Sequence, residues 1–299
     1  MVGLLALVAL LASGCSLLQP ADIGSVQNQL DAIKAPAVIK VGVEVMASGT
    51  LVKQPDGSLL ICAEQASLAD SAPECATAEV RINGLIHGEI PSWNQVGDSQ
   101  SASGITVRGR WAGDSLDDVE IAHGLQGQED VPYPENPCPG LQGLTASQHA
   151  GEYDAATRKL WQAVASDPVG YGGVWNAGSQ GTSIVVVGVA GDPSAARTRL
   201  KPDYPFPVCF VRVPRSAAEL GAAASAVKAI DPAWITRIQA PVSRVQVYVP
   251  YVDEAVWSKL EPLADLLVVS PLVRPVPEAA LDANSVRPGT PTIGAQGLW

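Results

Sequence analysis

Basic residues, histidine and long apolar runs are scarce in this chain of 299 residues. It contains 19 Lys and Arg against 30 Asp and Glu, which gives a net charge of -11. Because nucleic-acid affinity comes largely from Lys and Arg that release counterions from phosphates, this balance argues against a nucleic-acid partner. It also argues against a polybasic membrane patch. We expect the acidic surface simply to keep the protein soluble.

The three histidines, His87, His123 and His149, are scattered along the chain, and there is no Cys-x-x-Cys pair. We therefore expect no zinc site. Each histidine stands without a recognisable nucleophilic or orienting neighbour, which argues against a general base. The acidic pairs Asp117-Asp118 and Glu129-Asp130 lack the Asp-x-Asp-x-Asp-Gly loop of a calcium site. We expect no bound cofactor.

One serine stands in a sequence known from hydrolases. Gly113-Asp114-Ser115-Leu116 spells the motif of the GDSL enzymes. Those enzymes place the motif after an early strand of a parallel sheet and use a late Asp-x-x-His partner, whereas the last histidine here is His149. A serine hydroxyl without a base is a poor nucleophile at neutral pH. We therefore expect Ser115 to lie in a polar turn and the chain not to be an enzyme.

After its first residues the chain has no apolar run that approaches 18 residues, so we expect no membrane-spanning helix there. Residues Val2 to Ala12 are almost purely apolar and lead into Ser13-Gly14-Cys15. These 11 residues are too few to span a bilayer as a helix. They are typical of the apolar core of a secretory signal.

This start resembles the signal of bacterial lipoproteins, in which small residues precede a cysteine that carries diacylglycerol. It departs from that pattern at Ala12, where leucine is commonest, and no Lys or Arg precedes the apolar run. The resemblance implies a signal peptide over residues 1–14 and acylation of Cys15 with fatty acids such as palmitate. Two or three acyl chains would anchor the protein firmly in the cell membrane, on its extracytoplasmic side. The alternative is a buried N-terminal helix with an incidental cysteine.

Four cysteines remain once Cys15 is acylated, and four cysteines allow three connectivities. Proximity along the chain favours Cys62–Cys75, which closes a Pro-containing loop, and Cys138–Cys209, which ties an interdomain linker to a core strand. An oxidising compartment makes both disulfides plausible. The alternative is that these thiols are free and buried.

The pattern of apolar residues predicts an α+β protein of two domains. The first, over residues 37–123, alternates short β-branched runs with turns such as Pro55-Asp56-Gly57-Ser58. Five or six short strands suggest a small all-β barrel of the OB type, a fold that often binds nucleic acids or sugars, although the basic face for such ligands is missing here. The expected strands are Val38–Val45, Gly49–Val52, Leu59–Cys62, Ala78–Ile86, Gly104–Trp111 and Val119–Ala122.

The second domain, over residues 145–275, mixes helices and strands and is expected to have a mostly antiparallel or mixed sheet. A helix is predicted near Asp154–Val164, and Ser216-Ala217-Ala218-Glu219 is a capping box before another. Asp192 is expected to cap a third helix, and a fourth is predicted from Asp253 to about Leu263. The expected strands are Gly172–Asn176, Ser183–Val189, Pro207–Val213, Trp234–Ile238, Arg244–Val249 and Leu266–Val269. The remaining segments are a lipidated stalk (15–36), a Pro- and Gly-rich linker (124–144) and a Pro-rich tail (276–299).

A series of short motifs runs through residues 165–271, namely Tyr171-Gly172-Gly173-Val174-Trp175, the strand Ile184–Val189, the helix with Ser194-Ala195-Ala196-Arg197, the strand Val208–Val213, Ser216-Ala217-Ala218-Glu219-Leu220, Trp234 and the Val-rich strand 245–249. In this order they resemble the pro-region of secreted bacterial serine proteases of the α-lytic/streptogrisin type. Such pro-regions bind their protease, speed its folding and inhibit it, through a sheet edge and a C-terminal tail. Only about 28 residues follow Pro271 here, so we expect no protease domain. The resemblance implies a fold with a protein-binding edge.

These observations favour a non-enzymatic lipoprotein of the cell envelope that binds another macromolecule or ligand, with protein as the favoured partner. We predict its binding surface at a sheet edge of the second domain or at the tail, which ends in Leu298-Trp299. For Trp299 the alternative is an unstructured terminus. Two other functions stay open, an envelope hydrolase with an unrecognised site and a structural spacer or assembly protein.

Overall fold

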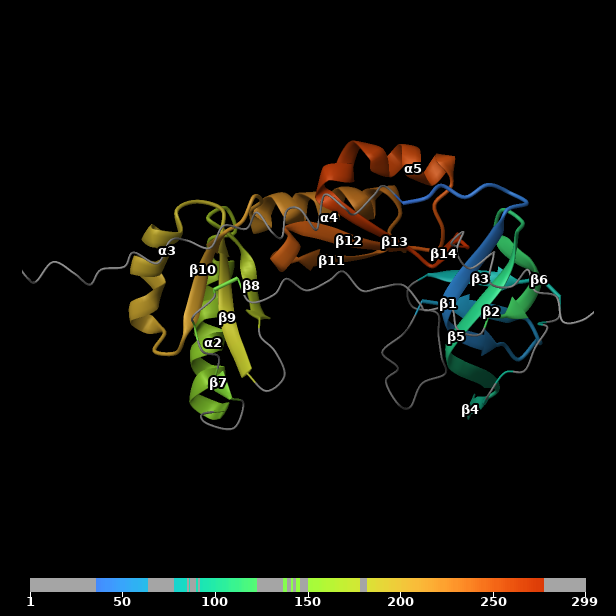
Figure 1. The fold of residues 1–299 in the computed structure, drawn as a ribbon, viewed down its shortest axis with the longest axis horizontal. Coiled ribbons are helices and arrows are strands. Elements are labelled where there is room, and N and C mark those ends of the chain that lie inside the picture. The colour runs from blue at the N-terminus through green and yellow to red at the C-terminus, as the bar shows by residue number, and fades with distance from the viewer. Residues whose placement is uncertain are drawn as a thin grey trace, which may run out of the picture. The chain divides into compact units, whose positions relative to one another are not determined.

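The computed structural model describes residues 36–63, 78–84, 86, 90, 92–122, 137–138, 141, 144–145, 150–177 and 182–276 (Figure 1). These residues form a mixed α+β protein with four α-helices and three β-sheets. They divide into two compact units. The first unit holds the described residues between 137 and 219 together with 240–243. The second holds those between 36 and 122, 220–239 and 244–276.

The largest sheet lies in the second unit and closes into a five-stranded barrel. Its strand order is β14-β1-β2-β3-β6-β5-β4, and a further pairing between β1 and β5 closes β1-β2-β3-β6-β5 on itself. Neighbouring strands are antiparallel except β3 and β6, which run parallel. The strands are β1 (Glu44–Lys53), β2 (Leu59–Cys62), β3 (Glu79–Ile82), β4 (Asn94–Val96), β5 (Ser99–Trp111), β6 (Ser115–Ile121) and β14 (Val273–Pro275).

Alternating apolar side chains fill the inside of this barrel, as the period of a strand requires. On β1, Val45, Ala47 and Leu51 are fully buried, and a register shift between Gly49 and Leu51 keeps this pattern facing inward. Gly49 is needed because a Cβ there would overlap the carbonyl oxygen of Cys62 on β2. The barrel core also contains Ile61, Val80, Ile82, Val107, Trp111, Leu116 and Val119.

The expected strand Val38–Val45 is wrong for most of its length, because β1 begins only at Glu44. Gly42 turns the chain with a φ of 86°, and the amide of Ile39 donates to the carbonyl of Val252 at 2.8 Å. Residues 36–40 therefore do not pair in the barrel sheet, and Ile39 is bonded instead to Val252 of the same unit. The turn predicted at Pro55-Asp56-Gly57-Ser58 is confirmed, since it joins β1 to β2 with Gly57 at a φ of 85°.

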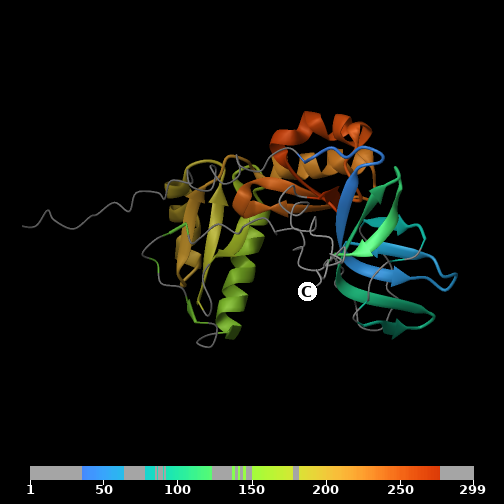
Figure 2. The ribbon, with the colours of Figure 1, turned by 45° about the vertical axis from the view of Figure 1, so that its right-hand side comes forward.

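The sheet of the first unit has apolar residues on both faces. Its strands are β7 (Leu144–Thr145), β8 (Tyr171–Ala177), β9 (Thr182–Val189) and β10 (Val208–Arg212), with β8 antiparallel and β10 parallel to β9. Val185 and Val187 pack with helices α2 (Ala150–Ala165) and α3 (Pro193–Leu200), whereas Ile184 and Val186 pack with the cysteines of the Cys138–Cys209 disulfide. Burial on both faces explains the continuous Val run of β9. Figure 2 shows α2 beside this sheet.

A separate three-stranded sheet lies in the second unit, in the order β11 (Ile235–Gln239), β12 (Arg244–Val249) and β13 (Leu267–Pro271). β11 is antiparallel and β13 parallel to β12. Helices α4 (Ala217–Ile230) and α5 (Glu254–Leu260) lie on the same side of it in both views (Figures 1 and 2). Leu220, Val227 and Leu260 from these helices pack with Val245 and Val247 of β12.

The capping box predicted before α4 is confirmed. The amide of Ser216 donates to Oε2 of Glu219 at 2.8 Å, and the amide of Glu219 donates back to Oγ of Ser216 at 3.2 Å. The hydrogen bond from the Ser216 amide stabilises the carboxylate and lowers the pKa of Glu219. Asp192 caps α3, as predicted, and Asp253 caps α5, because each side chain accepts from a backbone amide of the first turn.

Residues 150–212 and 217–271 repeat one arrangement of elements. Each segment runs helix, strand, strand, helix, strand, with the first two strands antiparallel and the second and third parallel. The details also correspond. Asp167-Pro168 and Asp231-Pro232 follow the first helix of each segment, and Asp192 and Asp253 begin the second. The chain therefore contains two copies of an αββαβ unit, which we call the first and second copy.

The predicted domain bounds stay a prediction, and the arrangement of the sheets differs from the one expected. We expected residues 145–275 to form one domain with a single sheet, but they form two mixed sheets, and residues 220–239 and 244–275 group with the barrel. The reason is that the chain returns to the barrel after β13. Leu272 and Val273 are buried in the barrel core, and β14 pairs antiparallel with β1. The expected stalk, linker and tail fall mostly outside the described residues.

Candidate functional site

Several predicted site residues lie outside the described residues, namely Cys15, Cys75, His87, His123, His149 and Trp299. The predicted Cys138–Cys209 disulfide is present and joins residues 71 positions apart. Cys62 is also disulfide-bonded, but its predicted pairing with Cys75 stays a prediction. Among the described residues no group of His, Cys, Asp or Glu could hold a metal ion.

Ser115 begins strand β6 and is buried in the barrel wall. Its hydroxyl donates to Oδ1 of Asp114 at 3.0 Å and accepts a hydrogen bond from the side-chain amide of Asn83 at 2.9 Å. The same amide nitrogen also donates to Asp117 at 2.9 Å. These contacts tie the β5–β6 hairpin to the end of β3, and no histidine is among the three neighbours.

Charged side chains gather on the barrel strands β1, β5 and β6. Arg108 pairs with Glu44 at 2.8 Å and with Glu120, and Arg110 pairs with Asp118. They border a hollow of about 310 Å³. Each guanidinium already has a carboxylate partner, so neither is free to bind an anion, and such exposed pairs contribute little to stability.

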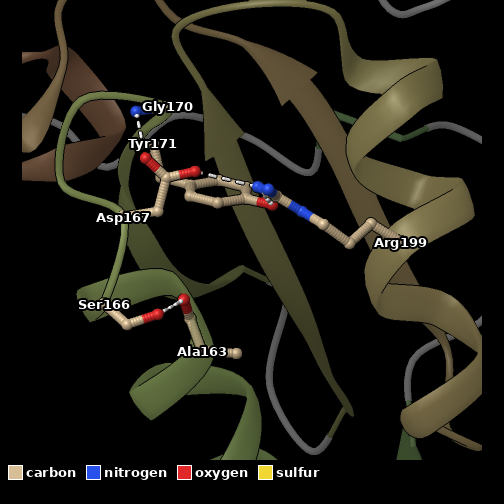
Figure 3. Close-up of polar contacts among 6 residues, drawn as sticks. All are labelled: Ala163, Ser166, Asp167, Gly170, Tyr171 and Arg199. Carbon is tan, nitrogen blue, oxygen red and sulfur yellow. Dashed lines mark hydrogen bonds and ion pairs between the residues drawn. The ribbon is translucent and has the colours of Figure 1, made fainter.

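A second polar cluster joins α3 to the loop before β8 in the first unit (Figure 3). Nη2 of Arg199 donates to Oδ2 of Asp167 at 2.9 Å and to the hydroxyl of Tyr171 at 2.6 Å, and Asp167 also accepts from the amide of Gly170 at 3.0 Å. The hydrogen bond from Arg199 lowers the pKa of Asp167. The cluster holds the start of β8 against α3.

Strand β11 stands out because it is an edge strand without a single buried residue. None of its five residues is buried, whereas four of six are buried on β12 and three of five on β13. Among the described residues β11 pairs with β12 alone. In an antiparallel pair every second residue turns its amide and carbonyl away from the neighbouring strand. One side of β11 therefore presents backbone donors and acceptors.

The side chains of β11 divide between two faces that the register with β12 defines. Arg237 lies opposite Gln246, and its guanidinium sits 5.5 Å from the ring centre of Tyr248. Ile238 lies opposite Val245, yet 46% of its surface is exposed. The strand thus carries a cation on one face and an uncovered β-branched side chain on the other.

A row of hydrogen-bonded polar side chains crosses the sheet beneath Arg237. Nε2 of Gln239 donates to Oε1 of Gln246 at 2.7 Å, and Nε2 of Gln246 donates to Oγ of Ser270 at 3.1 Å. Gln246 and Ser270 are almost completely buried. A buried polar group is costly unless it is hydrogen-bonded, and here each amide has a partner. This row fixes β11 in register with β12 and β13.

The sequence predicted a binding edge in this half of the chain but not which strand forms it. A signal that could have pointed to β11 is its composition. Ile235-Thr236-Arg237-Ile238-Gln239 contains three polar residues and no valine, whereas β9 and β12 are rich in valine. A segment with more polar than apolar residues is typical of a strand that is open to solvent.

Among the described residues, no helix has both the length and the apolar character that a membrane span requires. Comparison of the chain with protein-family models and with curated protein sequences finds no match.

Proposed function

We propose that this chain is a lipid-anchored protein of the cell envelope that binds another protein through the edge strand β11 and has no catalytic role of its own. The observation that carries this proposal is the contrast between β11, which has no buried residue, and its buried neighbours β12 and β13. Natural proteins usually cover or blunt such an edge, because it can pair with a strand from another chain. Pairing of this kind is a common mode of peptide recognition.

The resemblance of residues 165–271 to protease pro-regions supports the same mode of binding. In that family a sheet edge contacts the partner protein. In this chain the expected order of elements is present, from β8 through β9, α3, β10 and α4 to β11, β12, α5 and β13. What we carry over is the use of an edge for binding, without the protease activity.

The barrel serves in this proposal as a rigid base of the OB type for the binding sheet. Its support is the strand order β1-β2-β3-β6-β5 with closure onto β1, and the parallel pairing of β3 with β6, which is the connectivity of an OB barrel. Within the second unit, Trp111 of the barrel packs against Tyr251 with ring centres 4.7 Å apart, and the amide of Leu272 donates to the carbonyl of Val249.

The anchor in this proposal is Cys15, which the signal-like start of the chain predicts to be acylated. Growth of cells with labelled palmitate tests this part. We expect label on the wild-type protein and none on the Cys15→Ser variant. An unlabelled wild type, or equal label on the variant, would remove the anchor while leaving the binding edge untouched.

A photo-crosslinking amino acid placed at position 238 tests the binding edge in intact cells. We expect one defined crosslinked protein from this position and none from position 169, because Val169 is also an exposed apolar residue, at 72%, but lies in the loop between α2 and β8 of the first unit and not in a strand. The adduct should disappear when Arg237 and Thr236 are both changed to proline, which cannot donate to a strand ladder. The same adducts from both positions, or none from 238, would refute binding at β11.

A further inference from the structure

The two faces of β11 restrict which strand can pair with it. By the register with β12, Ile235, Arg237 and Gln239 share a face with Tyr248, Gln246 and Arg244, whereas Thr236 and Ile238 share the face of Val247 and Val245. The second face is the one that packs with α4 and α5, since Val245 and Val247 belong to that core. A strand added beside β11 would continue both faces, because its side chains alternate in the same way.

The first of these faces is positively charged at the edge. Arg237 is exposed, and Arg244 at the start of β12 is half-exposed. Neither guanidinium lies within 4.0 Å of a carboxylate in the described part of the chain, although Arg108, Arg110 and Arg199 each have one. Within the described residues these two arginines therefore add positive charge to the face, although the chain as a whole has a net charge of -11. Opposite charges on neighbouring strands stabilise pairing, and like charges oppose it.

The second face is apolar and incomplete at the edge. Ile238 is 46% exposed, although its cross-strand neighbour Val245 is fully buried. An apolar side chain on an added strand would cover Ile238 and extend the core under α4 and α5. A charged side chain at the same place would lose hydration without gaining a partner.

The first copy of the αββαβ unit shows how the equivalent strand looks when it is covered. By order and pairing, β8 corresponds to β11. Five of the seven residues of β8 are buried, and the segment Ala240–Val242 packs against it. No residue of β11 is buried. The second copy is thus left open at the strand that the first copy covers.

From these observations we propose that β11 pairs with an extended segment of a partner protein in which acidic residues alternate with apolar residues. An acidic side chain lies beside Arg237, on the face that also carries Arg244 one strand further in, and an apolar side chain, best a β-branched one, covers Ile238. This inference rests on the proposed function, because it specifies the chemistry of the partner at the same edge.

Three fluorescein-labelled nonapeptides test this chemistry on the full chain, and differ only in whether Glu, Gln or Lys alternates with Val. We expect the Glu peptide to bind about tenfold more tightly than the Lys peptide at low salt, with the Gln peptide between them, when binding is measured by fluorescence anisotropy. Added salt should reduce the difference. Arg237→Glu should reverse the order of the Glu and Lys peptides. Arg158→Glu, the same change at an exposed arginine of α2, should leave it unchanged.

The outcomes separate the two proposals. Equal binding of the three peptides that is lost in Ile238→Lys would overturn the acidic partner and leave binding at the β11 edge intact. If no peptide binds but the crosslink at position 238 is still present, the proposed acidic and apolar pattern of the partner is overturned and the binding edge is not. Absence of the crosslink itself would overturn the proposed function.

Discussion

The disulfide between Cys138 and Cys209 should be a major source of stability in the first unit. It joins residues 71 positions apart, and a loop of that length loses chain entropy in the unfolded state equivalent to about 4 kcal/mol of stability. Cys209 is fully buried on β10, beside Trp175, Val186 and Val211. The variant with both cysteines changed to alanine keeps a small apolar residue at each position. We therefore expect the stability that this variant loses to come mainly from the missing crosslink.

This loss of stability can be measured by urea unfolding, with hydrogen exchange of the β9 and β10 amides as the probe. With a slope of about 2 kcal/mol per M urea, a loss of 4 kcal/mol corresponds to a shift of the midpoint by about 2 M. A reducing agent should shift the wild type by more than it shifts the double alanine variant, and the difference isolates this disulfide from the one that contains Cys62. Equal shifts of the two proteins in reductant would refute the reasoning.

Two further predictions concern single residues. Gly49→Ala should destabilise the protein by about 1–3 kcal/mol, because the added Cβ overlaps the carbonyl of Cys62. Gly221→Ala in α4 meets no atom and should stabilise the protein by about 0.5–1 kcal/mol. Shifts of the urea midpoint in the same direction for both variants would contradict this. Arg199 lowers the pKa of Asp167 in the folded state, so its contribution to stability is present above the ordinary value of 3.8 and is lost as the pH falls. The free energy of unfolding of Asp167→Asn should therefore decrease less than that of the wild type between pH 6 and pH 3. Parallel pH profiles of the two proteins would show that the Asp167–Arg199 pair does not cause the loss of stability at low pH.

Local signals in the sequence predicted most elements of the fold. The Ser216 to Glu219 capping box and the caps at Asp192 and Asp253 fix the starts of α4, α3 and α5, because each uses contacts within one turn of helix. The Val-rich pattern likewise located β9 and β12. The part of β5 from Ser99 to Ser103 was missed, since it reads as a polar loop although Ser99 and Ser101 are buried.

Pairings between distant residues could not be predicted in this way. Nothing near Val273, Arg274 and Pro275 indicates that they form β14, because the strand exists only through its pairing with Val45 to Ala47 of β1. Pro275 suits this place at the edge of the sheet, where no ladder hydrogen bond is required of it. The same return of the chain moves the second copy into the unit of the barrel. For the candidate site, the sequence predicted an edge, but the burial and pairing of the strands were needed to identify β11.

The way in which residues 36–40 are held within the second unit determines how the unit resists a mechanical pull on this segment. Val38 packs into the core beneath α4 and α5, the amide of Ile39 bonds to Val252, and the chain then enters β1, which pairs with β2, β5 and β14. A pull on residue 36 from any tether is therefore shared at once between two cores. Both the barrel and the sheet that contains β11 would resist such a pull, because residues 38 and 39 contact the second sheet's core and Val252 just before the chain enters β1.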